Sequence, residues 1–140
     1  MAATIGIAQV LFTKKKYQAT IDTCKKILTT NTNSIEATKL IAKCYLAERK
    51  IQNARIYLKK ALNIQPDNYE LIKDLGNTYQ AVGDSNTAKI YYQKALEINS
   101  SFAPALTNLG SIELNTDKKQ EALSLLIRAC LLYTSDAADE

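Results

Sequence analysis

Apolar and small residues recur along the chain with a period of 34 residues. When the 140 residues are divided into blocks of 34 from residue 1, equivalent positions align without a gap. The seventh position of each block is Ile or Leu and the eighth is Ala or Gly: Ile7, Ile41, Leu75 and Leu109, then Ala8, Ala42, Gly76 and Gly110. A period of this length is typical of repeat proteins in which each repeat is one small structural motif.

Each block contains two amphipathic helical patterns. In the third block, apolar side chains recur at steps of three and four residues from Leu71 to Tyr79 and again from Ala88 to Leu96. Gly83 lies between the two patterns, where it can adopt the positive φ that ends a helix. Asp84 or Ser85 can then cap the next helix. The pattern therefore predicts one helix-turn-helix unit per block.

Further helix starts are predicted from capping boxes, in which a short polar residue is followed three places later by Glu or Gln. Three pairs have this spacing: Asn33 with Glu36, Asp67 with Glu70, and Asp117 with Gln120.

The order of residue types resembles the tetratricopeptide repeat. The third block carries the family's apolar, Gly, Tyr and Ala positions nearly throughout: Ile72, Leu75, Gly76, Tyr79, Ala88, Tyr92 and Ala95. The fourth block departs from the family with Glu113 in place of Tyr, and the first with Thr20 in place of Ala. The resemblance implies an all-α, right-handed α-solenoid of four repeats: residues 1–34 (degenerate), 35–68, 69–102 and 103–129 (truncated).

Residues 130–140 resemble the translation of a transposon-end sequencing adapter. We therefore expect an artefactual tail, a microbial source, and an authentic chain that stops near Ala129 inside a helix; the alternative is a short acidic tail. Without a capping helix, the last repeat should leave Leu123, Leu126 and Ile127 poorly covered. We expect this C-terminal helix to fray or to self-associate.

Composition favours binding over catalysis. The chain is 46% hydrophobic and 23% charged, as in ordinary globular proteins, and it contains no His, the commonest general base and metal ligand. Cys24 and Cys44 lie singly within helical patterns, which predicts buried, reduced thiols. No stretch approaches the ~20 apolar residues of a membrane span, and no secretory leader is recognised. We expect a cytoplasmic, non-catalytic protein without cofactor or metal.

The resemblance implies that ligands dock on a concave face lined by the first helix of each repeat. The side chains predicted to form the site are Lys39, Lys43, Lys73, Asn77, Gln80, Asn108 and Ser111. Lys73, Asn77 and Asn108 also resemble part of the clamp with which chaperone cofactors hold acidic C-terminal peptides. Ammonium and amide groups donate charge-assisted hydrogen bonds to carboxylates. We expect a protein-interaction scaffold that binds an acidic or extended peptide, although a solvated polar surface is the alternative for each residue.

Two other functions remain as alternatives. Residues 1–68 carry 12 Lys and Arg against 4 Asp and Glu, a balance of +8 that could attract nucleic acid. Aromatic residues for base stacking are not interleaved with these cations, which disfavours that interpretation. The resemblance also allows the array to be the N-terminal region of a larger microbial transferase, a sulfotransferase or glycosyltransferase whose catalytic domain is missing.

Overall fold

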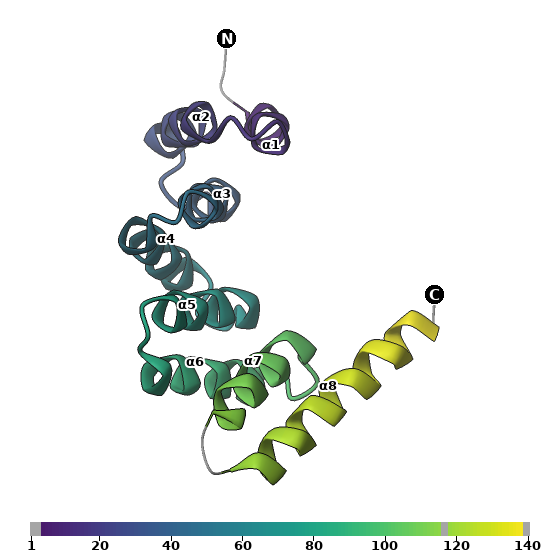
Figure 1. Cartoon of the computed structure of the whole chain (residues 1–140). Helices are drawn as coiled ribbons and strands as arrows, with labels where there is room; N and C mark the ends of the chain where they lie inside the picture. The colour runs from purple at the N-terminus through teal and green to yellow at the C-terminus, as the bar shows by residue number, and fades with distance from the viewer. Residues whose placement is uncertain (1–3, 116–117, 139–140) are drawn as a thin grey trace. The chain divides into compact units, whose positions relative to one another are not determined.

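The computed structural model describes residues 4–115 and 118–138, in which all regular structure is α-helical. Eight helices follow one another in these ranges (Figure 1): α1 (Ile5–Thr13), α2 (Tyr17–Thr30), α3 (Ile35–Ala47), α4 (Ile51–Ile64), α5 (Tyr69–Ala81), α6 (Ser85–Ile98), α7 (Ala103–Leu114) and α8 (Lys119–Ala138). This confirms the all-α helical repeat predicted from the sequence. None of the described helices combines the length and the apolarity needed to cross a membrane.

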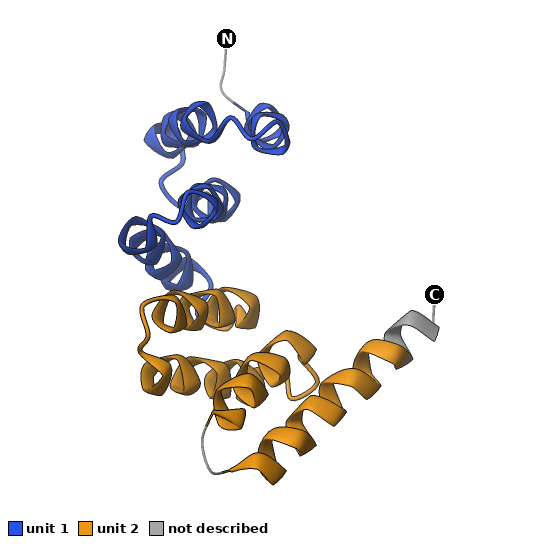
Figure 2. Ribbon diagram, viewed as in Figure 1, with its two compact units in different colours: residues 1–66 blue, residues 67–140 orange. Residues whose placement is uncertain are grey.

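The helices form two compact units (Figure 2): unit 1 comprises residues 1–66, and unit 2 comprises residues 67–140. Each unit contains two helix pairs, and within it the second helix of one pair packs against the first helix of the next. In unit 1, Cys24 of α2 belongs to the same buried cluster as Cys44 of α3. In unit 2, Tyr92 of α6 belongs to the same buried cluster as Ile112 of α7. Because these pairs occupy the same positions of the 34-residue period, both units are built around one kind of helix contact.

The turns between paired helices share one backbone geometry. Gly83 has a φ of +85°, as predicted, and Lys15 (φ 59°) and Arg49 (φ 58°) adopt the same left-handed region at equivalent positions. The amide after each of them donates to the carbonyl five residues earlier, as in Lys50 to Tyr45 at 2.8 Å. This bond is the signature of a Schellman motif. The turn therefore forms even where no glycine is available.

The first residues of α3 and α5 correct two of the predicted capping boxes. The cap of α3 is Ser34, whose Oγ accepts from the amide of Ala37 at 3.3 Å. The cap of α5 is Asn68, whose Oδ1 accepts from the amide of Leu71 at 3.2 Å. The predicted pairs Asn33–Glu36 and Asp67–Glu70 are therefore wrong by one residue. Each Glu lies at the second helical position, one residue short of the place from which it could reach back to the cap.

The remaining capping predictions have different outcomes. Asp84 caps α6, because its Oδ1 accepts from the amide of Thr87 at 3.1 Å. Asp117, predicted to pair with Gln120, lies outside the described residues.

Helix α8 continues past Ala129 to Ala138. Leu123 and Ile127 on this helix are exposed, and Leu126 is half-buried. The prediction of poorly covered side chains on the last helix is confirmed for Leu123 and Ile127.

Candidate functional site

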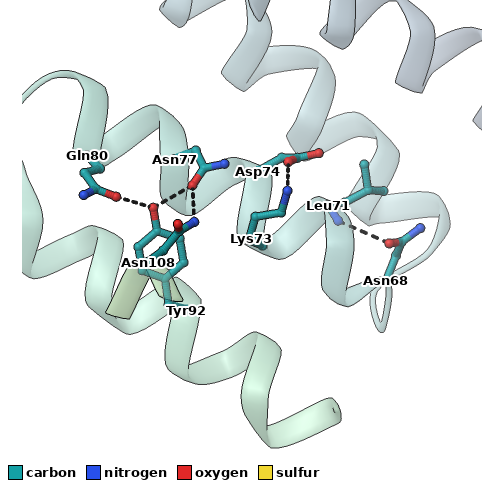
Figure 3. A network of polar contacts seen from close by, with 8 residues as sticks. All are labelled: Asn68, Leu71, Lys73, Asp74, Asn77, Gln80, Tyr92 and Asn108. Carbon is teal, nitrogen blue, oxygen red and sulfur yellow. Dashed lines mark hydrogen bonds and ion pairs between the residues drawn. The ribbon is translucent and has the colours of Figure 1, made fainter. Parts of the chain in front are cut away.

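Three of the predicted site residues meet around one buried hydroxyl group in unit 2 (Figure 3). Tyr92 of α6 is fully buried, and its hydroxyl donates to Oδ1 of Asn77 on α5 at 2.7 Å. Oε1 of Gln80, one turn further along α5, lies 2.6 Å from the same hydroxyl oxygen. Asn108 of α7 donates from Nδ2 to Oδ1 of Asn77 at 2.9 Å. This cluster of Asn77, Gln80, Tyr92 and Asn108, the Tyr92 network, ties α5, α6 and α7 together.

The Tyr92 network uses only part of the hydrogen-bonding capacity of its two asparagines. Oδ1 of Asn77 accepts two bonds, whereas its Nδ2 group makes no bond to the described residues. Nδ2 of Asn108 donates to Asn77, which leaves Oδ1 of Asn108 as an acceptor. Both side chains are half-buried and therefore reach solvent. The pair presents one donor group and one acceptor, which match the C=O and N–H of a peptide backbone.

Gly76 positions the Tyr92 ring against α5. A Cβ atom at this residue would lie 2.8 Å from Cε1 of Tyr92 and 3.0 Å from its Cδ1, closer than carbon atoms pack. The absence of a side chain lets the ring lie directly on the helix backbone. The hydroxyl can then reach Asn77, the next residue of α5.

Lys73 forms an ion pair with the next residue of α5, Asp74. Its Nζ lies 2.8 Å from Oδ1 of Asp74, and both side chains are partly exposed (Figure 3). The two side chains are only 21% and 25% exposed, so a carboxylate from a ligand must take the place of Asp74 to bind this ammonium group.

The other predicted site residues lie on first helices of both units. Ser111 is exposed on α7, and its Oγ donates to the carbonyl oxygen of Thr107 at 2.9 Å. In unit 1, Lys39 is half-buried and Lys43 is exposed on α3. The four-residue spacing of these lysines puts both ammonium groups on one face of that helix.

Burial raises the pKa of Tyr92 to about 12; the hydrogen bond from Asn108 opposes this shift, and the Asp74 carboxylate adds to it. The folded protein therefore holds this proton more tightly than the unfolded chain does. The resulting stabilisation is present below about pH 10 and is lost as the pH rises towards 12. A shift of this size corresponds to about 3 kcal/mol in full, of which about 2 kcal/mol is lost by pH 12.

Between about pH 9 and about pH 12, we expect the free energy of unfolding to fall by about 2 kcal/mol more in the wild-type protein than in the Tyr92→Phe variant. Urea unfolding followed by circular dichroism measures this difference. The two proteins share all other titrating groups, so equal losses would show that Tyr92 does not titrate as proposed.

The two buried cysteines are poor nucleophiles. Cys24 and Cys44 are free thiols, which confirms the prediction of buried, reduced residues. Burial is the main cause that raises the pKa of each to about 11. At neutral pH both are protonated, whereas the reactive form of cysteine is the thiolate. Within the described ranges, no group of three or more His, Cys, Asp or Glu side chains could hold a metal ion.

Residues 40–68 and 57–90 match two sequence profiles of the tetratricopeptide repeat. Residues 40–90 of the chain therefore belong to tetratricopeptide repeats. No protein of curated function matches its sequence. Such repeats generally act as non-enzymatic scaffolds for protein–protein interaction, and this broad role agrees with the sequence analysis.

Solved structures of low sequence identity share the tetratricopeptide fold. The crystal structure of MamA matches with a TM-score of 0.85 and 19% identity, over 96% of this chain and 78% of that one. MamA 41-end from Desulfovibrio magneticus RS-1 matches with a TM-score of 0.81 and 18% identity, over 94% of this chain and 74% of that one. YrrB, described as a TPR protein with an unusual peptide-binding site, matches with a TM-score of 0.76 and 22% identity. The match covers 91% of this chain and 66% of that one. These matches identify the fold class as an all-α helical-repeat solenoid.

Proposed function

We propose that this tetratricopeptide repeat protein binds an extended peptide segment on the concave face of its first helices, and that it favours acidic partners. The observation that carries the proposal is the bond between Asn77 and Asn108. This bond uses Oδ1 of Asn77 and Nδ2 of Asn108, so Nδ2 of Asn77 and Oδ1 of Asn108 remain as a donor and an acceptor for the backbone of a ligand. Gln80 and Ser111 are further polar contacts on α5 and α7.

The Tyr92 network supports the proposal because it holds the recognition groups in place before a ligand arrives. Side chains that are ordered in the free protein lose less conformational entropy on binding. Asn77 Nδ2 would donate to a peptide carbonyl, and Asn108 Oδ1 would accept from a peptide amide. Contacts of this kind recognise the backbone and therefore tolerate many ligand sequences.

The lysines supply the preference for acidic ligands. Lys39 and Lys43 share one face of α3, and unit 1 is strongly basic. Lys73 is held by Asp74, and a ligand carboxylate would take the place of that side chain on the ammonium group. YrrB, which shares the fold, is described as having a peptide-binding site, and this agrees with a peptide as the class of ligand.

We expect Asn77→Asp to weaken peptide binding at least about tenfold, or about 1.4 kcal/mol. The substitution keeps the Oδ1 acceptor for Tyr92 and Asn108 but removes the outward donor. The probes are a fluorescein-labelled peptide of alternating aspartate and alanine, and its uncharged counterpart with asparagine in place of aspartate. Fluorescence anisotropy should show the loss for both peptides.

A second comparison separates charge recognition from backbone recognition. Lys39→Glu with Lys43→Glu should weaken only the acidic peptide, whereas Lys25→Glu with Lys26→Glu, the same charge change on exposed residues of α2, should leave its affinity within about twofold. Equal losses in both double variants would refute the basic face on α3. Displacement of the peptide by single-stranded RNA, with a steep salt dependence, would favour the nucleic-acid alternative instead.

A further inference from the structure

The first helix of the chain exposes side chains that are buried at the same positions of the other first helices. The seventh and tenth residues of each 34-residue block are at most 7% exposed in α3, α5 and α7: Ile41, Cys44, Leu75, Thr78, Leu109 and Ile112. In α1 the equivalent residues are Ile7, which is 43% exposed, and Val10, which is 53% exposed. The exposed face of α1 is therefore equivalent to the face of α3 that packs against α2. It is also equivalent to the face of α7 that packs against α6.

The last helix exposes the complementary half of the same contact. Leu123 of α8 is 57% exposed, whereas Ile21, at the equivalent position of α2, is 1% exposed and packs in the cluster shared with α3. Leu126 is half-buried, whereas its equivalents Cys24 and Tyr92 are fully buried. The exposed face of α8 is therefore equivalent to the face of α2 that α3 covers. It is also equivalent to the face of α6 that α7 covers.

A largely apolar groove lies beside this face of α8. Its volume is about 490 Å³, and its walls come from α7 and α8, including Thr107, Leu126 and Ala129. A first helix that packs on α8 in the manner of α7 on α6 would lie along this groove.

We propose that copies of this chain associate head to tail, with α1 of one copy packed against α8 of the next. Ile7 and Val10 would then contact Leu123 and Leu126, as Leu109 and Ile112 contact α6 within unit 2. Charge does not oppose this pairing, because residues 1–68 carry 12 − 4 = +8, whereas residues 69–129, which precede the expected artefactual tail, carry 6 − 7 = −1. The two surfaces differ, so the interface is heterologous and each added copy leaves another end open.

Sedimentation velocity of the full chain tests this proposal over about 10 μM to about 1 mM, because one helix face buries little area and should bind weakly. A reductant is present throughout, since Cys130 is an exposed free thiol. The wild-type mass should rise with concentration beyond a dimer. Val10→Lys and Leu123→Lys, each at an exposed position, should both remain monomeric.

The decisive experiment is to mix the Val10→Lys and Leu123→Lys variants. Val10→Lys keeps an intact α8 face and Leu123→Lys keeps an intact α1 face, so the mixture should form a one-to-one dimer and nothing larger. Ile56→Lys is the control, because Ile56 on α4 is 52% exposed but belongs to neither face, and it should associate as the wild type does. A monomeric wild type at about 1 mM, or loss of association in Leu123→Lys but not in Val10→Lys, would overturn the proposal.

Discussion

Lys89→Met is expected to lower the free energy of unfolding of unit 2 by about 2–3 kcal/mol. Lys89 Nζ on α6 forms an ion pair with Oε1 of Glu113 on α7. The Glu113 residue is 3% exposed, so its carboxylate depends on partners within the protein. Removal of the ammonium group takes away the opposite charge that Lys89 supplies to this buried carboxylate. The estimate lies at the low end for buried pairs because Lys89 is partly exposed and water can enter the space it leaves.

Hydrogen exchange of the α6 and α7 amides measures this effect locally, which suits a repeat array in which helices open region by region. The control is the double variant Lys89→Met with Glu113→Leu, which removes both charges and should recover most of the lost stability. If the double variant were as unstable as Lys89→Met, the loss would come from side-chain packing of Lys89 and not from its ion pair with Glu113.

Gly76→Ala is expected to destabilise unit 2 by about 1–2 kcal/mol, because an overpacking cost at the upper end of about 1–3 kcal/mol is offset by a gain of about 1 kcal/mol in helix propensity. The added Cβ would lie 2.8 Å from Tyr92, and the ring has no room to move because it is fully buried and its hydroxyl is hydrogen-bonded. The substitution should also disturb the Tyr92 network and therefore weaken peptide binding.

Gly110→Ala is the matched comparison, because Gly110 holds the same repeat position. Its added Cβ would lie 2.9 Å from Cγ of Leu126, a half-buried aliphatic side chain that can change rotamer. We expect a loss of at most about 1 kcal/mol in thermal unfolding, since the gain in helix propensity offsets a smaller clash. Equal destabilisation by the two substitutions would contradict the role assigned to the Tyr92 ring.

The fold could be predicted from the sequence because the 34-residue period repeats both the helix patterns and the small residues that let helices approach. Helix starts were harder to place. Asn33 and Ser34, like Asp67 and Asn68, are adjacent residues that can both cap a helix, and only the backbone conformation decides between them. The positive φ of Arg49 could not be predicted from the sequence either, because residues other than glycine rarely adopt the left-handed region.

The candidate site was predicted only in part. Repeat positions identify Asn77 and Asn108, but they mark Tyr92 only as an aromatic packing residue and not as the hydroxyl that holds Asn77. A Tyr at a core position carries a hydroxyl that needs a partner, and this signal could have linked it to the polar residues of α5. Glu113 was noted only as a departure from the family, because its partner Lys89 belongs to the preceding repeat.

The central claim is that a peptide binds along the first helices beside the paired asparagines. Titration of the ¹⁵N-labelled protein with the aspartate–alanine peptide, followed by two-dimensional NMR, tests it most directly. We expect the side-chain amide signal of Asn77 and the backbone amides of α5 and α7 to shift with a common saturation curve. Shifts confined to the second helices α2, α4 and α6, with the Asn77 side-chain signal unmoved at saturation, would contradict it.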